Sequence, residues 1–155
     1  MSTLRTLPAL LSILLSGYAL SGTDVSETFP NTFWLEIAET AQASLTKLSG
    51  IHAEPPNFHG FEMLGTGTME KPVEVARLVS LLHNEIANPL PGISLCFIPR
   101  HAVTIKAAGS TFDFLICYEC SNIRVMKDSH EIYFGTINGS SKRVVDLLFA
   151  AYVSS

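Results

Sequence analysis

The sequence predicts an α+β domain, built as a mostly antiparallel sheet of about four strands with helices packed on one face. Three segments indicate this class. Residues 70–88 repeat apolar side chains at helical spacing, residues 94–106 and 111–126 are strand-like runs around the turn "AAGS", and residues 138–153 form a further amphipathic helix. Helices and antiparallel strands mixed in one chain of 155 residues fit a two-layer domain with one core.

Two elements are expected before this region. Residues 32–50 predict a helix, because apolar side chains recur there at spacings of three and four and Gly50 stands where a helix would stop. The recurring residues are Phe33, Ile37, Ala41, Leu45 and Leu48. Residues 58–69 alternate as a strand does, and their three glycines favour an edge strand or a bulge.

The helix over 70–88 has the clearest pattern. Pro72 suits the first turn, and the apolar face consists of Val75, Leu78, Val79, Leu82 and Ile86. The two runs that follow predict a β-hairpin, whose buried face would hold Val103, Ile105, Phe112, Phe114 and Ile116. Residues 130–137 predict a further strand. The last helix is expected to be capped by serine and to bury Val145, Leu148, Phe149 and Tyr152.

The first 21 residues have the layout of a secretory signal peptide. Arg5 supplies a positive start, Leu7 to Leu20 is an apolar run, and small residues from Ala19 to Ser21 mark a cleavage site. We therefore expect a signal peptide at 1–21, a flexible lead-in at 22–31 and a single domain at 32–155. The mature protein would be secreted or periplasmic and would not remain in the membrane.

The charge balance excludes some partners. Removal of Arg5 leaves nine Lys and Arg against 14 Asp and Glu, a net charge of −5. No basic cluster remains to neutralise a run of phosphates, so we expect no nucleic-acid partner. A protein or small-molecule partner fits better.

All three cysteines lie in "SLCFIPRHAVTIKAAGSTFDFLICYECSNIRV", residues 94–125, together with His101. If the turn centres on Ala108 and Gly109, facing residues have numbers that sum to 217, which brings Cys96, His101, Cys117 and Cys120 to the open end of the hairpin. A Cys96–Cys120 disulfide is the favoured interpretation. A zinc site of all four residues and three packed, reduced thiols are the alternatives.

Catalysis is the weaker hypothesis. His101 and Cys117 would be diagonal neighbours, but only Asp113 or Glu119 could orient such a pair. His59 and His83 fit a strand edge and a helix surface. Asn138 begins a glycosylation sequon that applies only in a eukaryote, and a turn with a helix cap explains it otherwise.

Two motifs resemble a group of small, uncharacterised bacterial proteins with a "CFxPRHG" strand followed by "DLVICFEC". The matching residues are Cys96, Phe97, Pro99, Arg100 and His101, then Asp113, Leu115, Ile116, Cys117, Glu119 and Cys120. The resemblance covers about residues 58–153 and departs at Ala102 and Tyr118. It supports the fold and draws attention to Arg100, Asp113 and Glu119, but it implies no activity.

These observations predict an exported, non-catalytic binding or interaction domain without a cofactor, stabilised by its Cys/His cluster. One specific alternative is a periplasmic immunity protein that neutralises a toxin. The others are a structural zinc-binding domain and, further off, a thiol-dependent enzyme.

Overall fold

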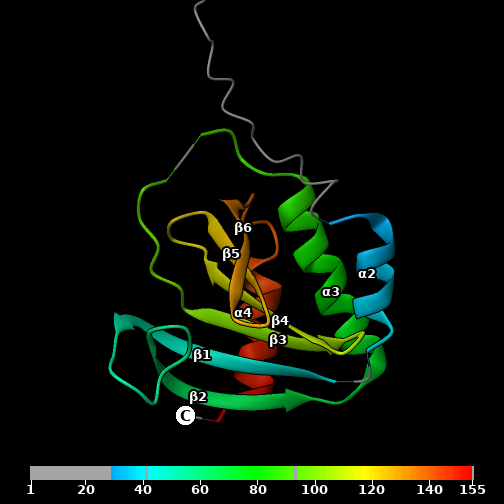
Figure 1. Ribbon diagram of the computed structural model, residues 1–155, viewed down its shortest axis with the longest axis horizontal. Helices are drawn as coiled ribbons and strands as arrows, with labels where there is room; N and C mark the ends of the chain where they lie inside the picture. The colour runs from blue at the N-terminus through cyan, green and yellow to red at the C-terminus, as the bar shows by residue number, and fades with distance from the viewer. Residues whose placement is uncertain (1–28, 41, 93, 155) are drawn as a thin grey trace, which may run out of the picture.

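In the part of the chain that the structure describes, a single antiparallel sheet of six strands forms the centre, with three helices packed against it (Figure 1). This computed structural model describes residues 29–40, 42–92 and 94–154. The elements in chain order are α2 (Asn31–Ala38), β1 (Ala43–His52), β2 (Phe61–Met69), α3 (Pro72–Ala87), β3 (His101–Ala107), β4 (Ser110–Cys117), β5 (Asn122–Lys127), β6 (His130–Thr136) and α4 (Lys142–Tyr152).

The predicted α+β class is confirmed, whereas the predicted strand number of about four is too low. The sheet order is β2-β1-β3-β4-β5-β6, and each neighbouring pair is antiparallel. The predicted signal peptide lies outside the described residues. The predicted lead-in reaches them only at its end, where Phe29 is buried and α2 begins at Asn31.

The main core lies between the helices and one side of the sheet, which we call the helix face. The predicted apolar sides of α3 and of the β3–β4 hairpin are both buried there, which confirms them. The predicted residues that belong to this core are Val75, Leu78, Val79, Leu82, Ile86, Val103, Ile105, Phe112, Phe114 and Ile116. Figure 1 shows α2 and α3 side by side, with α4 behind the strands.

The helix predicted over residues 32–50 is wrong in its second half. Helix α2 ends at Ala38, and strand β1 begins at Ala43. Leu45 packs in the core of the helix face, whereas Leu48 packs with Ala102 and Leu115 on the opposite side of the sheet. A strand buried on both faces thus placed two leucines three residues apart, a spacing that is also typical of helices.

The register predicted for the hairpin is confirmed, because His101 pairs with Ile116 and Val103 with Phe114. Its two predicted strands are shorter than expected. A turn at residues 118–121 divides the run 111–126 into β4 and β5, and residues 94–100 form no strand. We call this last segment the 94–100 strap.

The side of the sheet opposite the helices, the open face, is covered by irregular chain. Its small core consists of Leu48, Phe61, Ala102 and Leu115, with Phe58, Phe97 and Met126 packed against it. Phe58 comes from the loop 53–60 and Phe97 from the 94–100 strap. The ring of Phe97 lies 6.0 Å from that of Phe61 and 5.6 Å from that of Phe134. The strap therefore ties the two outer parts of the sheet together.

A buried carboxylate holds the start of α4. Glu85, on α3 and only 1% exposed, accepts hydrogen bonds from the backbone N–H groups of Gly139 and Ser141, each at 2.7 Å, and from the Ser141 hydroxyl at 2.5 Å. Ser141 is the N-cap residue, as predicted, but its side chain makes no capping bond and contacts Glu85 and Tyr118 instead. The cap is thus supplied from a distant helix.

The end of α4 rests on strand β2, the edge strand that the glycines predicted. A Cβ atom at Gly67 would collide with the carbonyl group of Tyr152, and one at Gly65 would crowd Ser154. These glycines let the chain after α4 approach the sheet closely. None of the helices within the described ranges has the length and apolarity needed to cross a membrane.

Candidate functional site

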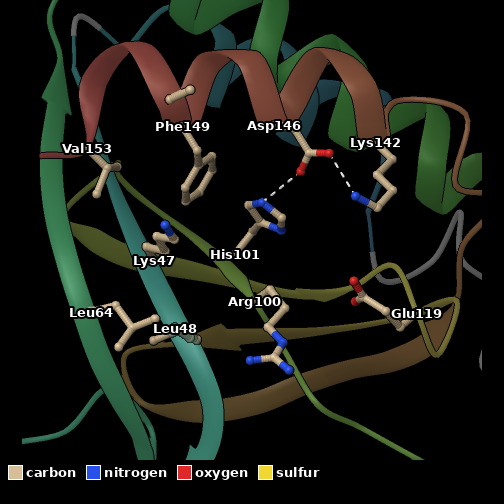
Figure 2. Close-up of a pocket in the computed structure, with 11 residues that line it drawn as sticks. Lys47, Leu48, Leu64, Arg100, His101, Glu119, Lys142, Asp146, Phe149 and Val153 are labelled. Carbon is tan, nitrogen blue, oxygen red and sulfur yellow. Dashed lines mark hydrogen bonds and ion pairs between the residues drawn. The ribbon is translucent and has the colours of Figure 1, made fainter. Parts of the chain in front are cut away.

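A pocket of about 540 Å³ lies on the helix face, between α4, the middle of β1 and β2, and the start of β3 (Figure 2). Its lining residues are Lys47, Leu48, Leu64, Arg100, His101, Glu119, Lys142, Asp146, Phe149, Ala150 and Val153. Leu64, Phe149 and Val153 form apolar walls, and most of the remaining side chains are charged. The pocket thus combines apolar walls with several ionic groups, as ligand sites commonly do.

Local structure explains how these residues meet. Lys142, Asp146, Phe149 and Val153 recur at spacings of three and four, which places them along one side of α4. Arg100 and His101 enter at the start of β3. The Arg100 backbone N–H donates to Ile116 at 3.1 Å and its carbonyl accepts from Leu48 at 3.0 Å. These two backbone hydrogen bonds, one to β4 and one to β1, fix the place at which the chain enters the pocket.

His101 lies at the centre of the pocket, beneath α4 (Figure 2). Its Nε2 atom is 3.1 Å from Oδ1 of Asp146, whose other oxygen is 2.7 Å from Nζ of Lys142. Its ring packs edge-on against Phe149 with centroids 4.6 Å apart. Burial lowers the pKa of His101 below its ordinary value, and the Asp146 carboxylate opposes that effect. Nδ1 is buried and has no partner among the described residues.

The pocket is positive in a protein that is negative overall. Three of the nine Lys and Arg residues after residue 5 line it, against two of the 14 Asp and Glu residues. Lys142 is neutralised by Asp146, whereas Lys47 forms no ion pair with a described carboxylate. The guanidinium of Arg100 donates to the carbonyl of Ser49 and points away from His101 and α4, so it lies at the far margin of the pocket (Figure 2). Lys47 is therefore the unneutralised cation beside the apolar wall of the pocket.

The three cysteines gather on the other side of the sheet, around the turn at 118–121. Cys96 and Cys120 lie at disulfide distance, with Cα atoms 5.8 Å apart, which is the pair that the hairpin register favoured. Cys117 is free and buried. Asn122 donates to the carbonyl of Ser94 at 3.1 Å and to that of Cys96 at 2.9 Å, which holds the strap beside the pair.

His101 does not join this cluster. It shares the helix face with Ile116 and Phe149, whereas Cys117 points to the open face and contacts the backbone of Ile98. The four side chains proposed as zinc ligands therefore do not converge. Within the described residues, no three His, Cys, Asp or Glu side chains are placed to hold a metal ion. Cys117 and His101, the pair considered for nucleophilic catalysis, do not contact each other, because they point to opposite faces of the sheet.

The remaining predicted residues have separate roles. Asp113 accepts from Thr104 and lies 2.8 Å from His59, which anchors the loop 53–60 on the open face. His83 stacks on Trp34 with ring centroids 4.8 Å apart.

Asn138 caps the end of α3. Its amide donates to the carbonyl groups of Asn84 at 3.2 Å and Asn88 at 3.0 Å, which supports the turn-and-cap interpretation. Glu119 is exposed at the pocket rim.

Sequence reasoning missed Lys47, Lys142 and Asp146. The spacing of 142, 146 and 149 on the last helix was the available signal, but nothing in the sequence placed that helix over His101.

Fold and site together define a single-sheet α+β domain with a cationic pocket on one side and a cysteine cluster on the other. The chain matches no protein-family model, no curated protein and no solved structure. The resemblance to small bacterial proteins remains a prediction. The function is therefore argued from the geometry.

Proposed function

We propose that this protein is an exported, non-catalytic binding domain whose pocket beneath α4 receives an anionic group, such as a carboxylate or phosphate. The observation that carries the proposal is the unneutralised cation Lys47 beside an apolar wall, in a pocket whose other lysine, Lys142, is paired with Asp146. Charge-assisted hydrogen bonds to such groups are stronger than neutral ones, above all when an apolar surface excludes water from one side.

The same pocket favours binding over catalysis. His101 is committed to Asp146 through Nε2, and burial lowers its pKa, so it is a poor proton carrier for a ligand. None of the lining side chains carries a hydroxyl or thiol that could act as a nucleophile. The free thiol of Cys117 belongs to the opposite face of the sheet.

Export is supported by the signal-peptide pattern and by the Cys96–Cys120 pair, since disulfides persist mainly in oxidising compartments. We propose that the bond forms and fastens the strap. Intact-mass measurement of protein recovered from the cell envelope or the medium tests both claims. A mass that retains Met1 contradicts cleavage, and three titratable thiols in the denatured, unreduced protein contradict the bond.

Anion binding is tested directly with citrate, succinate and inorganic phosphate as probes. Amide shifts in ¹H–¹⁵N spectra, recorded at constant ionic strength, would report both the affinity and the location. We expect the shifts to map to β1, the start of β3 and α4. Lys47→Gln should weaken binding about tenfold, which corresponds to about 1.4 kcal/mol.

Lys106→Gln is the matched control, because Lys106 is exposed on β3 away from this pocket. It removes the same charge from the protein and should leave the affinity unchanged. Equal weakening in both variants would indicate a general charge effect. No shift with any probe at millimolar concentration would refute the proposed site.

A protein partner is the second candidate, favoured by apolar side chains on and beside the strap. Leu95 is 99% exposed, and Ile98 and Phe134 are about half exposed. Exposed apolar residues near one another favour protein contact. An immunity protein would use such a surface. A partner captured by the wild-type protein and lost with Leu95→Lys, but retained with Lys47→Gln, would support this candidate over the pocket.

A further inference from the structure

The turn between β4 and β5 brings a free thiol next to the Cys96–Cys120 pair. The Sγ atom of Cys117 accepts a hydrogen bond from the backbone N–H of Cys120 at 3.1 Å and another from that of Ile98 at 3.4 Å. Cys117 ends β4, and Cys120 lies three residues further on, within the turn. The free sulfur therefore contacts the backbone of one disulfide partner and of the strap that carries the other.

We propose that this cluster is an intramolecular thiol–disulfide exchange site, in which Cys117 displaces Cys96 from Cys120 and thereby unfastens the 94–100 strap. The Cys117 thiol loses its proton, and the thiolate attacks Sγ of Cys120. A Cys117–Cys120 bond forms, the Cys96–Cys120 bond breaks, and Cys96 leaves as a thiolate that takes up a proton. One disulfide and one thiol are present before and after, so no external oxidant or reductant is needed.

The surroundings of Cys117 slow this exchange without preventing it. Burial raises the pKa of the Cys117 thiol, while the N–H groups of Ile98 and Cys120 act in the opposite direction. The charged groups near it are Glu119, which disfavours the thiolate, and Arg100, which favours it. Donors aimed at the sulfur stabilise the thiolate that attacks a disulfide. The exchange should therefore accelerate with rising pH.

The exchange changes which segment the disulfide fastens. Before exchange, Cys96 and the two hydrogen bonds from Asn122 hold the strap on the open face. After exchange, hydrogen bonds and the packing of Phe97 remain, but the covalent link at Cys96 is gone. The new thiol lies on an exposed residue, whereas the original thiol is buried, so a reagent can tell the two states apart.

Alkylation mapping tests the proposal on the intact protein without reductant. The native protein is incubated with iodoacetamide at pH 6.5, 7.5 and 8.5, quenched in acid and digested with trypsin. Cleavage after Arg77, Arg100, Lys106 and Arg124 separates residues 78–100, with Cys96, from residues 107–124, with Cys117 and Cys120. We expect the label to accumulate on Cys96, about tenfold faster for each pH unit while the thiol is mostly protonated.

The control is Cys117→Ser, with Cys117→Ala as a second variant should the first fold poorly. Neither variant should acquire label on Cys96. The inference rests on the proposed Cys96–Cys120 bond, and a denatured thiol count before incubation tests that bond separately: three thiols overturn both claims. With one thiol at the start, label on Cys117 alone, no label on Cys96, or equal Cys96 labelling in the variants overturns the exchange alone.

Discussion

Replacement of Glu85 by glutamine should destabilise the protein by about 3 kcal/mol. The carboxylate accepts three hydrogen bonds at the start of α4, and glutamine keeps the shape but turns one of the two oxygens into an amide donor. At least one N–H group then loses its acceptor, at about 1–3 kcal/mol. The remaining bonds lose the charge that strengthens them, at about 1 kcal/mol in total.

Urea unfolding followed by circular dichroism measures this effect. With a slope of about 1.5 kcal/mol per molar urea, a loss of 3 kcal/mol lowers the unfolding midpoint by about 2 M. Glu36→Gln is the control, because Glu36 is exposed on α2 and makes no side-chain hydrogen bond or ion pair with the described residues. It should change the free energy of unfolding by less than about 0.5 kcal/mol.

The outcome of this substitution tests the reasoning about the cap. If Glu85→Gln were as stable as the wild-type protein, the carboxylate would not be holding α4 in place. If Glu36→Gln were destabilised equally, the effect would belong to total charge rather than to the buried hydrogen bonds.

Three further predictions concern the disulfide, the glycine contact and the histidine. Cys96→Ala should lower the free energy of unfolding by about 3 kcal/mol, which is the chain-entropy value for the loop that a bond between Cys96 and Cys120, 24 positions apart, would close. Reductant should remove the difference from wild type. Gly67→Ala should cost about 1–3 kcal/mol by forcing the end of α4 off the sheet, whereas Thr66→Ala, on an exposed neighbour, should be nearly neutral in the same urea assay. Because burial lowers the folded-state pKa of His101 below 6.5, the unfolded chain binds that proton more readily, so stability is lost as pH falls through 6.5. The increase in stability from pH 5.5 to 7.5 should be smaller in His101→Asn, and an unchanged slope would contradict a buried, neutral imidazole beside Asp146.

Local patterns predicted the parts of the fold whose partners are close in the sequence. The turn at Ala108 and Gly109 fixed the register of β3 and β4, since each strand is paired with its immediate neighbour in the chain. Strand β1 was mistaken for a helix because Leu45 and Leu48 are buried against different layers. No single-sequence period separates that arrangement from a helix over so few residues.

The candidate site was only half predictable. The cysteine cluster depends on the hairpin, so its members could be brought together from the register alone. The pocket depends on α4 crossing over β3, a contact between residues more than 40 positions apart, as in the pair of His101 with Asp146. The cap from Glu85 likewise joins residues 56 positions apart. Such contacts follow from packing of the whole domain and leave no local signature.

The 94–100 strap ends at Arg100, so one short piece of chain belongs to the cysteine cluster at one end and to the pocket at the other. Equilibria that share a segment are thermodynamically linked. If release of Cys96 changes the affinity of the pocket by some factor, a bound anion must change the exchange equilibrium by the same factor. The occupancy of the pocket could then be read from the ratio of the two disulfide isomers, without any change in the overall redox state of the protein.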